Sequence, residues 1–133
     1  MTTFVDTSAL YPLLNADDDD HAAAAGWLGG PGSDPAEELV THSYVVIETT
    51  ALVHRRLGGD AVRAFLEHLL PTIGVVYVDE PLHRAATSAF LASLRRRPSL
   101  VDWVSFEMMR NGGIEQAFAF DRDFETQGFR TVP

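Results

Sequence analysis

Short apolar runs alternate along the chain with longer segments in which apolar residues recur every three or four positions. The short runs are rich in β-branched and aromatic residues and predict five strands, at residues 3–5, 38–42, 74–79, 116–120 and 129–132. The longer segments predict helices, at residues 8–14, 16–28, 43–59, 60–70, 81–97, 99–113 and 121–128. The glycines and prolines of residues 29–35 predict a loop.

The order of these predicted elements indicates the class of fold. A strand followed by a helix, repeated along the chain, favours an α/β fold with a mostly parallel sheet and helices on both of its faces. The predicted strands lack polar alternation, which is typical of strands that are buried on both faces. Since no linker divides the 133 residues, we expect a single domain over residues 1–133.

Composition narrows the class of protein further. Apolar residues make up 46% of the chain, which suits a globular protein, and the absence of cysteine excludes disulfides and thiolate zinc sites. The longest mostly apolar run, residues 69–78, is interrupted by Pro71 and Gly74 and is far shorter than the ~20 residues of a membrane span. No signal-peptide pattern is visible, so we expect a cytoplasmic protein with no membrane partner.

Charge and missing motifs exclude several function classes. The net charge is −9, and all ten basic residues are arginine. Such an acidic chain is a poor general binder of nucleic acid, so any RNA contact must rest on local arginines. Without lysine there is no ordinary P-loop, and there is no G-x-S-x-G elbow. The five histidines lack the spacing of a zinc site.

Four carboxylates stand out by their positions. Asp6 follows the first predicted strand, Asp121 follows the fourth, and Asp102 opens the predicted helix at 99–113. Glu48 lies within an apolar helical stretch. Sites in open α/β sheets lie beyond the carboxyl ends of the strands, so Asp6, Asp102 and Asp121 map to one edge of the predicted sheet.

Each of these acids also has a structural interpretation. Asp6 and Asp121 precede helices and suit the N-cap position. Residues 99–102 read S-x-x-D and fit a capping box, with Asp102 in the first turn. Glu48 has no basic neighbour before Arg55 and needs a partner if it is desolvated, but it also fits a solvent-exposed edge of its helix.

Taken together, the acids predict a metal site. Carboxylates that converge on one place repel one another, and their pKa values rise as a coupled set unless a cation is present. A set of oxygen ligands without cysteine suits Mg²⁺ or Mn²⁺. Because Mg²⁺ usually keeps several waters and binds substrate phosphate, the predicted site would be open to a phosphodiester.

Three consecutive arginines, Arg95, Arg96 and Arg97, end the predicted helix at 81–97. The helix dipole favours basic residues at a helix C-terminus, which is the structural interpretation. Contact with RNA phosphates is the functional alternative, and the sequence leaves both open.

The order of these motifs resembles the PIN-domain ribonucleases, especially the VapC-type toxins of bacterial toxin–antitoxin pairs. The resemblance covers essentially the whole chain. It is carried by FVDTSAL with Asp6, HSYVVIETTALVHRRLG with Glu48, SLVDWVSFEMMR with Asp102, and AFAFDRDFETQGF with Asp121 and the neighbouring Asp123. Trp103 departs from the family pattern, in which a small residue is common at this place.

The resemblance implies a parallel five-stranded sheet between helices, Mg²⁺-dependent cleavage of RNA, inhibition by a cognate antitoxin, and a homodimer. It gives direct metal contact to Asp6 and Asp102, with Glu48 and Asp121 completing the pocket directly or through water. Thr7 or Ser8 would orient the first carboxylate or a metal-bound water.

Two other functions fit parts of the sequence. A phosphatase-like hydrolase would use Asp6 as a covalent nucleophile. Such enzymes usually place a second acid two residues on, where this chain has Ser8, and use a lysine, which this chain lacks. A non-catalytic binding module would use the acids only as helix caps and surface charge.

Overall fold

The computed structural model describes residues 1–133 and contains one sheet of five parallel strands, in the order β3-β2-β1-β4-β5. The strands are β1 (Thr2–Val5), β2 (Glu38–His42), β3 (Gly74–Val76), β4 (Gln116–Phe118) and β5 (Arg130–Val132). The predicted α/β class with a parallel sheet is confirmed. Because β1 lies at the centre, the carboxyl ends of β1 and β4 are neighbours.

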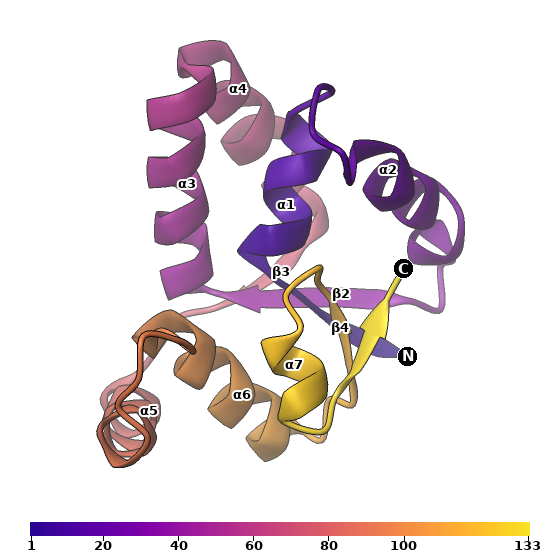
Figure 1. The fold of residues 1–133 in the computed structure, drawn as a ribbon. Helices are drawn as coiled ribbons and strands as arrows, with labels where there is room; N and C mark the ends of the chain where they lie inside the picture. The colour runs from indigo at the N-terminus through magenta and orange to yellow at the C-terminus, as the bar shows by residue number, and fades with distance from the viewer.

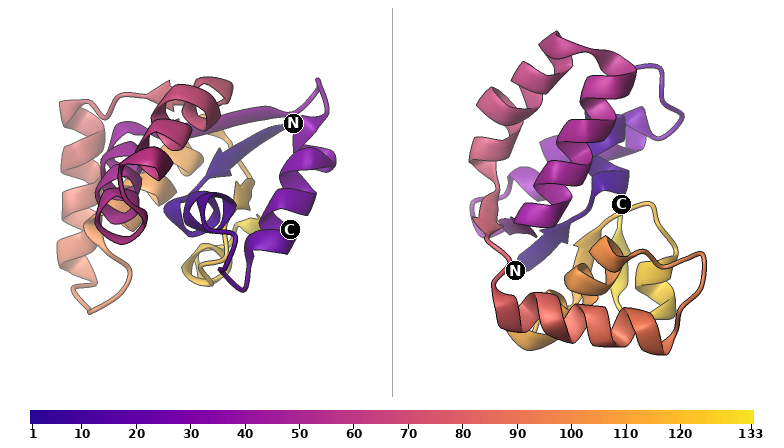
Figure 2. Two further views of the ribbon diagram at one scale, coloured as in Figure 1. Left: turned by 90° about the horizontal axis from the view of Figure 1, so that it is seen from above. Right: turned by 90° about the vertical axis from the view of Figure 1, so that its left-hand side faces the viewer.

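Helices cover both faces of this sheet, as predicted. Figure 1 shows α1 to α4 on one side of the sheet and α5 to α7 on the other, and the right-hand view of Figure 2 shows the same two layers. The helices are α1 (Thr7–Leu14), α2 (His21–Gly29), α3 (Ser43–Leu57), α4 (Gly59–Arg63), α5 (Glu80–Ala92), α6 (Leu100–Gly112) and α7 (Asp123–Thr126). None of them combines the length and the apolar character that crossing a membrane requires.

Aromatic side chains fill the core beneath β1. Phe4, Phe106 and Phe124 are fully buried. The ring of Phe124 meets that of Phe106 edge-on, with centroids 5.1 Å apart, and lies 6.0 Å from that of Phe4. Such aromatic pairs add ~0.5–1.5 kcal/mol each beyond the burial of their area. The packing therefore holds α6 and α7 against β1, whose last residue, Val5, precedes Asp6.

His42 fixes the start of α3. Its buried Nδ1 accepts a hydrogen bond from the Val45 backbone N–H at 3.3 Å, so Nε2 carries the proton and donates to Ser105 Oγ at 2.8 Å. Burial lowers the pKa of His42 to about 4. A neutral histidine thus links α3 to α6, the two helices that carry Glu48 and Asp102.

The helix that was predicted at 81–97 ends earlier, at Ala92. A helix through Arg97 is disfavoured, because Pro98 follows it and the residue before a proline is disfavoured in the α region, but the end at Ala92 comes five residues earlier. The interpretation of Arg95, Arg96 and Arg97 as a helix C-terminus is therefore wrong. All three arginines lie in the loop between α5 and α6.

Other boundaries also differ from the predicted ones. Strand β3 ends at Val76, and the backbone N–H of Val78 donates to Ser43 Oγ at 3.0 Å. Strand β4 ends at Phe118, and the backbone N–H of Phe120 donates to Ser8 Oγ at 3.0 Å. Side-chain hydroxyls thus replace strand pairing just beyond both strands.

The helix predicted at 60–70 is α4 followed by a π-helix, Ala64–Leu69, and a 3₁₀ turn, Leu70–Thr72.

Candidate active site

An open cleft of about 460 Å³ lies beyond the carboxyl ends of β1 and β4, and only three of the 14 residues that line it are hydrophobic. All four acids singled out in the sequence line it: Asp6, Glu48, Asp102 and Asp121. They come from the end of β1, the middle of α3, the first turn of α6 and the segment after β4. The topology therefore brings together carboxylates that are far apart in the sequence.

Asp6 is held rigidly at the base of this cleft. Its side chain caps α1, and Oδ2 accepts hydrogen bonds from the backbone N–H of Ser8 at 3.1 Å and from Ser8 Oγ at 2.7 Å. The residue is only 4% exposed. Burial raises the pKa of Asp6 to about 7, and the charges of Asp102 and Glu48 add to the rise, whereas the hydrogen bonds from Ser8 oppose it.

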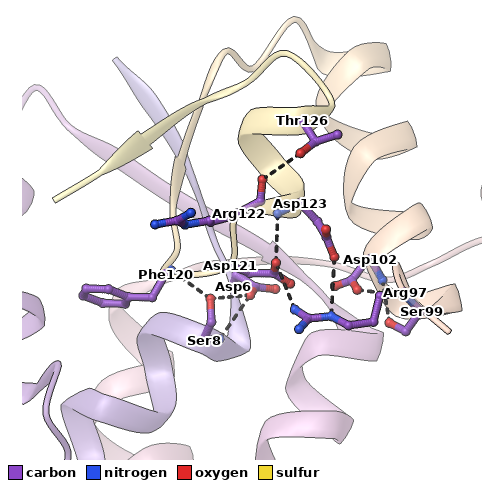
Figure 3. Close-up of polar contacts among 10 residues, drawn as sticks. All are labelled: Asp6, Ser8, Arg97, Ser99, Asp102, Phe120, Asp121, Arg122, Asp123 and Thr126. Atoms are coloured by element: carbon purple, nitrogen blue, oxygen red, sulfur yellow. Dashed lines mark hydrogen bonds and ion pairs between the residues drawn. The ribbon is translucent and has the colours of Figure 1, made fainter.

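Ser8 also ties Asp6 to the neighbouring strand. Its hydroxyl donates to Asp6 and accepts from the backbone N–H of Phe120, the residue before Asp121 (Figure 3). Thr7, the other hydroxyl considered in the sequence, instead hydrogen-bonds to Thr49 Oγ1 at 2.9 Å, between α1 and α3. The contact that orients the Asp6 carboxylate therefore comes from Ser8.

Asp102 occupies the capping box that its spacing predicts. Ser99 Oγ accepts from the backbone N–H of Asp102 at 3.2 Å, and Asp102 Oδ2 accepts from the backbone N–H of Ser99 at 2.9 Å. Burial raises the pKa of Asp102 to about 6, and the charges of Asp121 and Glu48 add to this, while the bonds to Ser99 oppose it. The cap and the acidic cleft thus share one carboxylate.

Asp121 and Asp123 lie next to each other after β4. Asp121 Oδ1 accepts a hydrogen bond from the backbone N–H of Asp123 at 2.9 Å. One carboxylate oxygen from each of Asp102, Asp121 and Asp123 lies within 4.8 Å of the others. Burial and the Asp121 charge raise the pKa of Asp123, and Arg97 opposes the rise. The tightest group of acids therefore includes Asp123, which the sequence suggested only as a supporting residue.

Glu48 lies in the cleft but outside this tight group. It is half-buried on α3, and its charge raises the pKa values of both Asp6 and Asp102. Its side chain makes no hydrogen bond or ion pair within the chain, so its carboxylate is free to bind a solvent molecule or an ion in the cleft.

Arg97 reaches the same acids from the loop between α5 and α6. Its Nη2 donates to Asp121 Oδ1 at 3.2 Å, and its Nε lies 3.7 Å from Asp123 Oδ2 (Figure 3). Neither Arg95 nor Arg96 forms an ion pair, and Arg95 lines an adjacent cavity with Arg97 and Trp103. From the sequence, Arg97 fits a helix end or an RNA contact, and nothing there indicates its pairing with Asp121 and Asp123, 24 and 26 residues away.

Comparison with known proteins places this arrangement in a family. Residues 3–129 match the PIN domain. The chain belongs to the PIN-domain family. It is 37% identical over 131 residues to the 23S rRNA-specific endonuclease VapC20 of Mycobacterium tuberculosis, covering 97% of this chain and 96% of that protein. The resemblance to VapC-type PIN proteins is therefore confirmed, and so, at the level of the family, is the prediction of an enzyme that hydrolyses phosphodiester bonds.

Solved structures agree with this assignment. The crystal structure of Mycobacterium tuberculosis VapC20, described as a sarcin–ricin loop cleaving toxin, superposes with a TM-score of 0.83 at 35% identity and covers 97% of this chain and 96% of its own. FitAcB from Neisseria gonorrhoeae has a TM-score of 0.72 at 15% identity, covering 100% of this chain and 97% of that one. This second likeness concerns the PIN fold alone.

The donor set of this PIN-domain cleft fits a hard divalent cation. The charged groups of its lining that could bind a metal are all carboxylates, and two of them, Asp102 and Asp121, come within 4.8 Å of the neighbouring Asp123. Asp123 Oδ2 is buried and has no hydrogen-bond partner. Buried polar atoms are normally satisfied, and a bound cation would satisfy this one. Burial is the main cause of the raised pKa values of Asp6 and Asp102, and the charges of the neighbouring carboxylates add to the rise.

Proposed function

We propose that the chain is a Mg²⁺-dependent endoribonuclease that acts as the toxin of a type II toxin–antitoxin pair, with Mn²⁺ as a possible substitute ion. The observation that carries the proposal is the gathering of Asp6, Glu48, Asp102 and Asp121 in one open cleft of a PIN domain. Similarity to the VapC20 endonuclease supports RNA as the substrate. Asp6, Asp102 and Asp121 are the residues that would hold the ion, with Glu48 completing the pocket directly or through water, and Asp123 lies beside Asp102 and Asp121.

A bound divalent ion would supply neutralisation of the scissile phosphate and a water of lowered pKa. The residues of the chain do the positioning. Ser8 and the capping box of Ser99 fix the carboxylates of Asp6 and Asp102 before any ligand arrives, so little ordering is left for the reaction itself. Glu48 is free to accept a hydrogen bond from the attacking water. No histidine lines the cleft, so carboxylates are the available general bases.

The direct test is cleavage of RNA by the purified protein. We suggest an RNA that contains the 23S sarcin–ricin loop, because VapC20 is described as cleaving that loop. We expect cleavage with Mg²⁺ or Mn²⁺ and none with EDTA. Asp6→Asn and Asp102→Asn should lose the activity. The control is Asp19→Asn, since Asp19 is exposed, makes no hydrogen bond and lies outside the cleft.

Two outcomes would favour the other functions. A stable acyl-phosphate on Asp6 would indicate the phosphatase-like hydrolase, although the chain has Ser8 where a second acid is expected and contains no lysine. Absence of cleavage, together with a melting temperature that Mn²⁺ does not change, would indicate a non-catalytic binding module.

The partners of this proposed toxin are an RNA substrate, a cognate antitoxin protein and a second copy of the chain, in the cytoplasm. A short open reading frame for a small DNA-binding protein immediately upstream would identify the antitoxin. Its product should co-purify with this chain and abolish cleavage. Light scattering should give twice the 14.6 kDa mass of one chain if the protein is a homodimer.

A further inference from the structure

One cation of the chain itself occupies the acidic cleft. Arg97 Nη2 donates to Asp121 Oδ1 at 3.2 Å, and Arg97 Nε lies 3.7 Å from Asp123 Oδ2. Figure 3 shows the guanidinium beside Asp121, with Asp123 and Asp102 close by. The chain has no lysine, and no basic group other than Arg97 forms an ion pair with Asp102, Asp121 or Asp123.

The acids that Arg97 contacts belong to the tight group. Asp121 and Asp123 each place a carboxylate oxygen within 4.8 Å of one from Asp102. Asp123 Oδ2 is buried and lacks a hydrogen bond, so the 3.7 Å approach of Arg97 compensates its charge without satisfying its geometry. A small ion bound by these oxygens would compete with the guanidinium for both aspartates.

The surroundings of Arg97 also allow its side chain to move away from Asp121 and Asp123. Its side chain is 70% exposed, whereas those of Asp121 and Asp123 are 13% and 25% exposed. It projects from an irregular loop rather than from a helix, and it lines a second cavity of about 320 Å³ next to the cleft. The guanidinium can therefore turn away from the acids without moving any strand or helix.

We propose that Arg97 is an internal counter-ion of the metal-free protein, which a divalent cation displaces from Asp121 and Asp123. This inference rests on the proposed metal-dependent function and adds a residue that tunes the affinity for the ion. It also explains how Asp102, Asp121 and Asp123 stay close together in a chain of net charge −9.

The test measures binding of Mn²⁺ alone, by calorimetry and by electron paramagnetic resonance, with no RNA present. Exposed ion pairs contribute modestly, so Arg97→Gln should bind Mn²⁺ about three- to tenfold more tightly than the wild-type protein. Arg96→Gln is the matched control, because it removes the same charge from the same loop but no ion pair. Arg97→Lys, which keeps the charge but not the fork, should lie between Arg97→Gln and the wild type.

A second measurement follows the wild-type side chain directly. In a ¹H–¹⁵N spectrum the Arg97 Nε–H signal should shift during a Mg²⁺ titration, with the same midpoint as Mg²⁺ binding. Equal Mn²⁺ affinity of Arg97→Gln and Arg96→Gln would overturn this inference, and so would an Arg97 Nε–H signal that does not shift when Mg²⁺ is added. Either result would leave the nuclease proposal intact. Failure of the wild-type protein to bind Mn²⁺ would overturn both.

Discussion

Ser99 and Asp102 cap each other at the start of α6: Ser99 Oγ accepts from the Asp102 N–H at 3.2 Å, and Asp102 Oδ2 accepts from the Ser99 N–H at 2.9 Å. The capping and ligand interpretations of Asp102 are therefore compatible. The cap uses one carboxylate oxygen, Oδ2, and holds the side chain in place within the cleft. A residue that begins a helix can in this way present its second oxygen to an ion.

We expect Ser99→Ala to lower the free energy of unfolding by about 1 kcal/mol, because the Asp102 N–H loses its acceptor. It should also weaken Mn²⁺ binding, since the Asp102 carboxylate is no longer fixed from both sides. Urea unfolding in EDTA and calorimetry with Mn²⁺ measure the two effects. Ser93→Ala is the control, because the Ser93 hydroxyl at the end of α5 makes no hydrogen bond. Equal stability of both variants would contradict the prediction.

Asp6→Asn should stabilise the metal-free protein at high pH. The pKa of Asp6 rises from 3.8 in the unfolded chain to about 7 in the folded protein. The folded state holds this proton more tightly, so its stabilising contribution is complete below pH ~4 and is lost as the pH rises through ~7. Asparagine keeps an oxygen acceptor for Ser8 without the charge.

Melting temperatures in EDTA therefore provide the measurement. Asp6→Asn should melt several degrees above the wild-type protein at pH 8, as expected for an effect of a few kcal/mol, and the difference should shrink as the pH falls and vanish below pH ~4. Asp19→Asn, a change at an exposed acid, should show no such trend. A variant less stable than the wild type at pH 8 would mean that the Asp6 carboxylate is a structural cap before anything else.

Metal binding should strengthen as the pH rises, whereas the stabilising contribution of the Asp6 proton is lost as the pH rises. Asp6 and Asp102, with pKa values near 7 and 6, must lose their protons before they can bind a cation. We expect Mg²⁺ to raise the melting temperature more at pH 8 than at pH 5.5. Equal shifts at both values would show that the ion binds away from these two aspartates.

Glu48→Gln separates the role of Glu48 from that of the helix that carries it. Glu48 makes no hydrogen bond, so Glu48→Gln breaks none. The change also removes a negative charge that repels Asp6 and Asp102, so the metal-free protein should keep or gain stability. Cleavage of RNA should fall strongly. Glu115→Gln, at an exposed position outside the cleft, is the control. A large drop in the melting temperature of metal-free Glu48→Gln would instead assign the residue a structural role.

Most of the site residues predicted from the sequence follow from one rule, that sites in open α/β sheets lie beyond the carboxyl ends of the strands. Asp6 and Asp121 follow neighbouring parallel strands, and residue order alone placed them at one edge of the sheet. Asp102 was recognisable from its S-x-x-D spacing. In each case a local pattern was sufficient, because the position depends on an element boundary that the pattern marks.

Arg97 and Thr7 depend instead on tertiary contacts. The direction of the Arg97 side chain follows from the early end of α5, which the continuous helical pattern of residues 81–97 concealed. Thr7 and Ser8 were indistinguishable as neighbours of Asp6, and the crossing of α1 and α3 turns the Thr7 hydroxyl toward Thr49. Neither contact has a local signature, so neither was predictable from one sequence.

His42 provides a prediction about folding in acid. Its pKa falls from 6.5 in the unfolded chain to about 4 in the folded protein, so its stabilising contribution is complete above pH ~6.5 and is lost as the pH falls through ~4. This trend is opposite to that of Asp6, and variants are needed to separate the two.

His42→Asn keeps an N-cap acceptor for Val45 but loses the bond to Ser105. We expect it to be less stable at pH 7, by about 1–3 kcal/mol, and to approach the wild type as the pH falls to 4. A constant difference in unfolding free energy from pH 7 to 4 would show that the His42 ring is not held neutral.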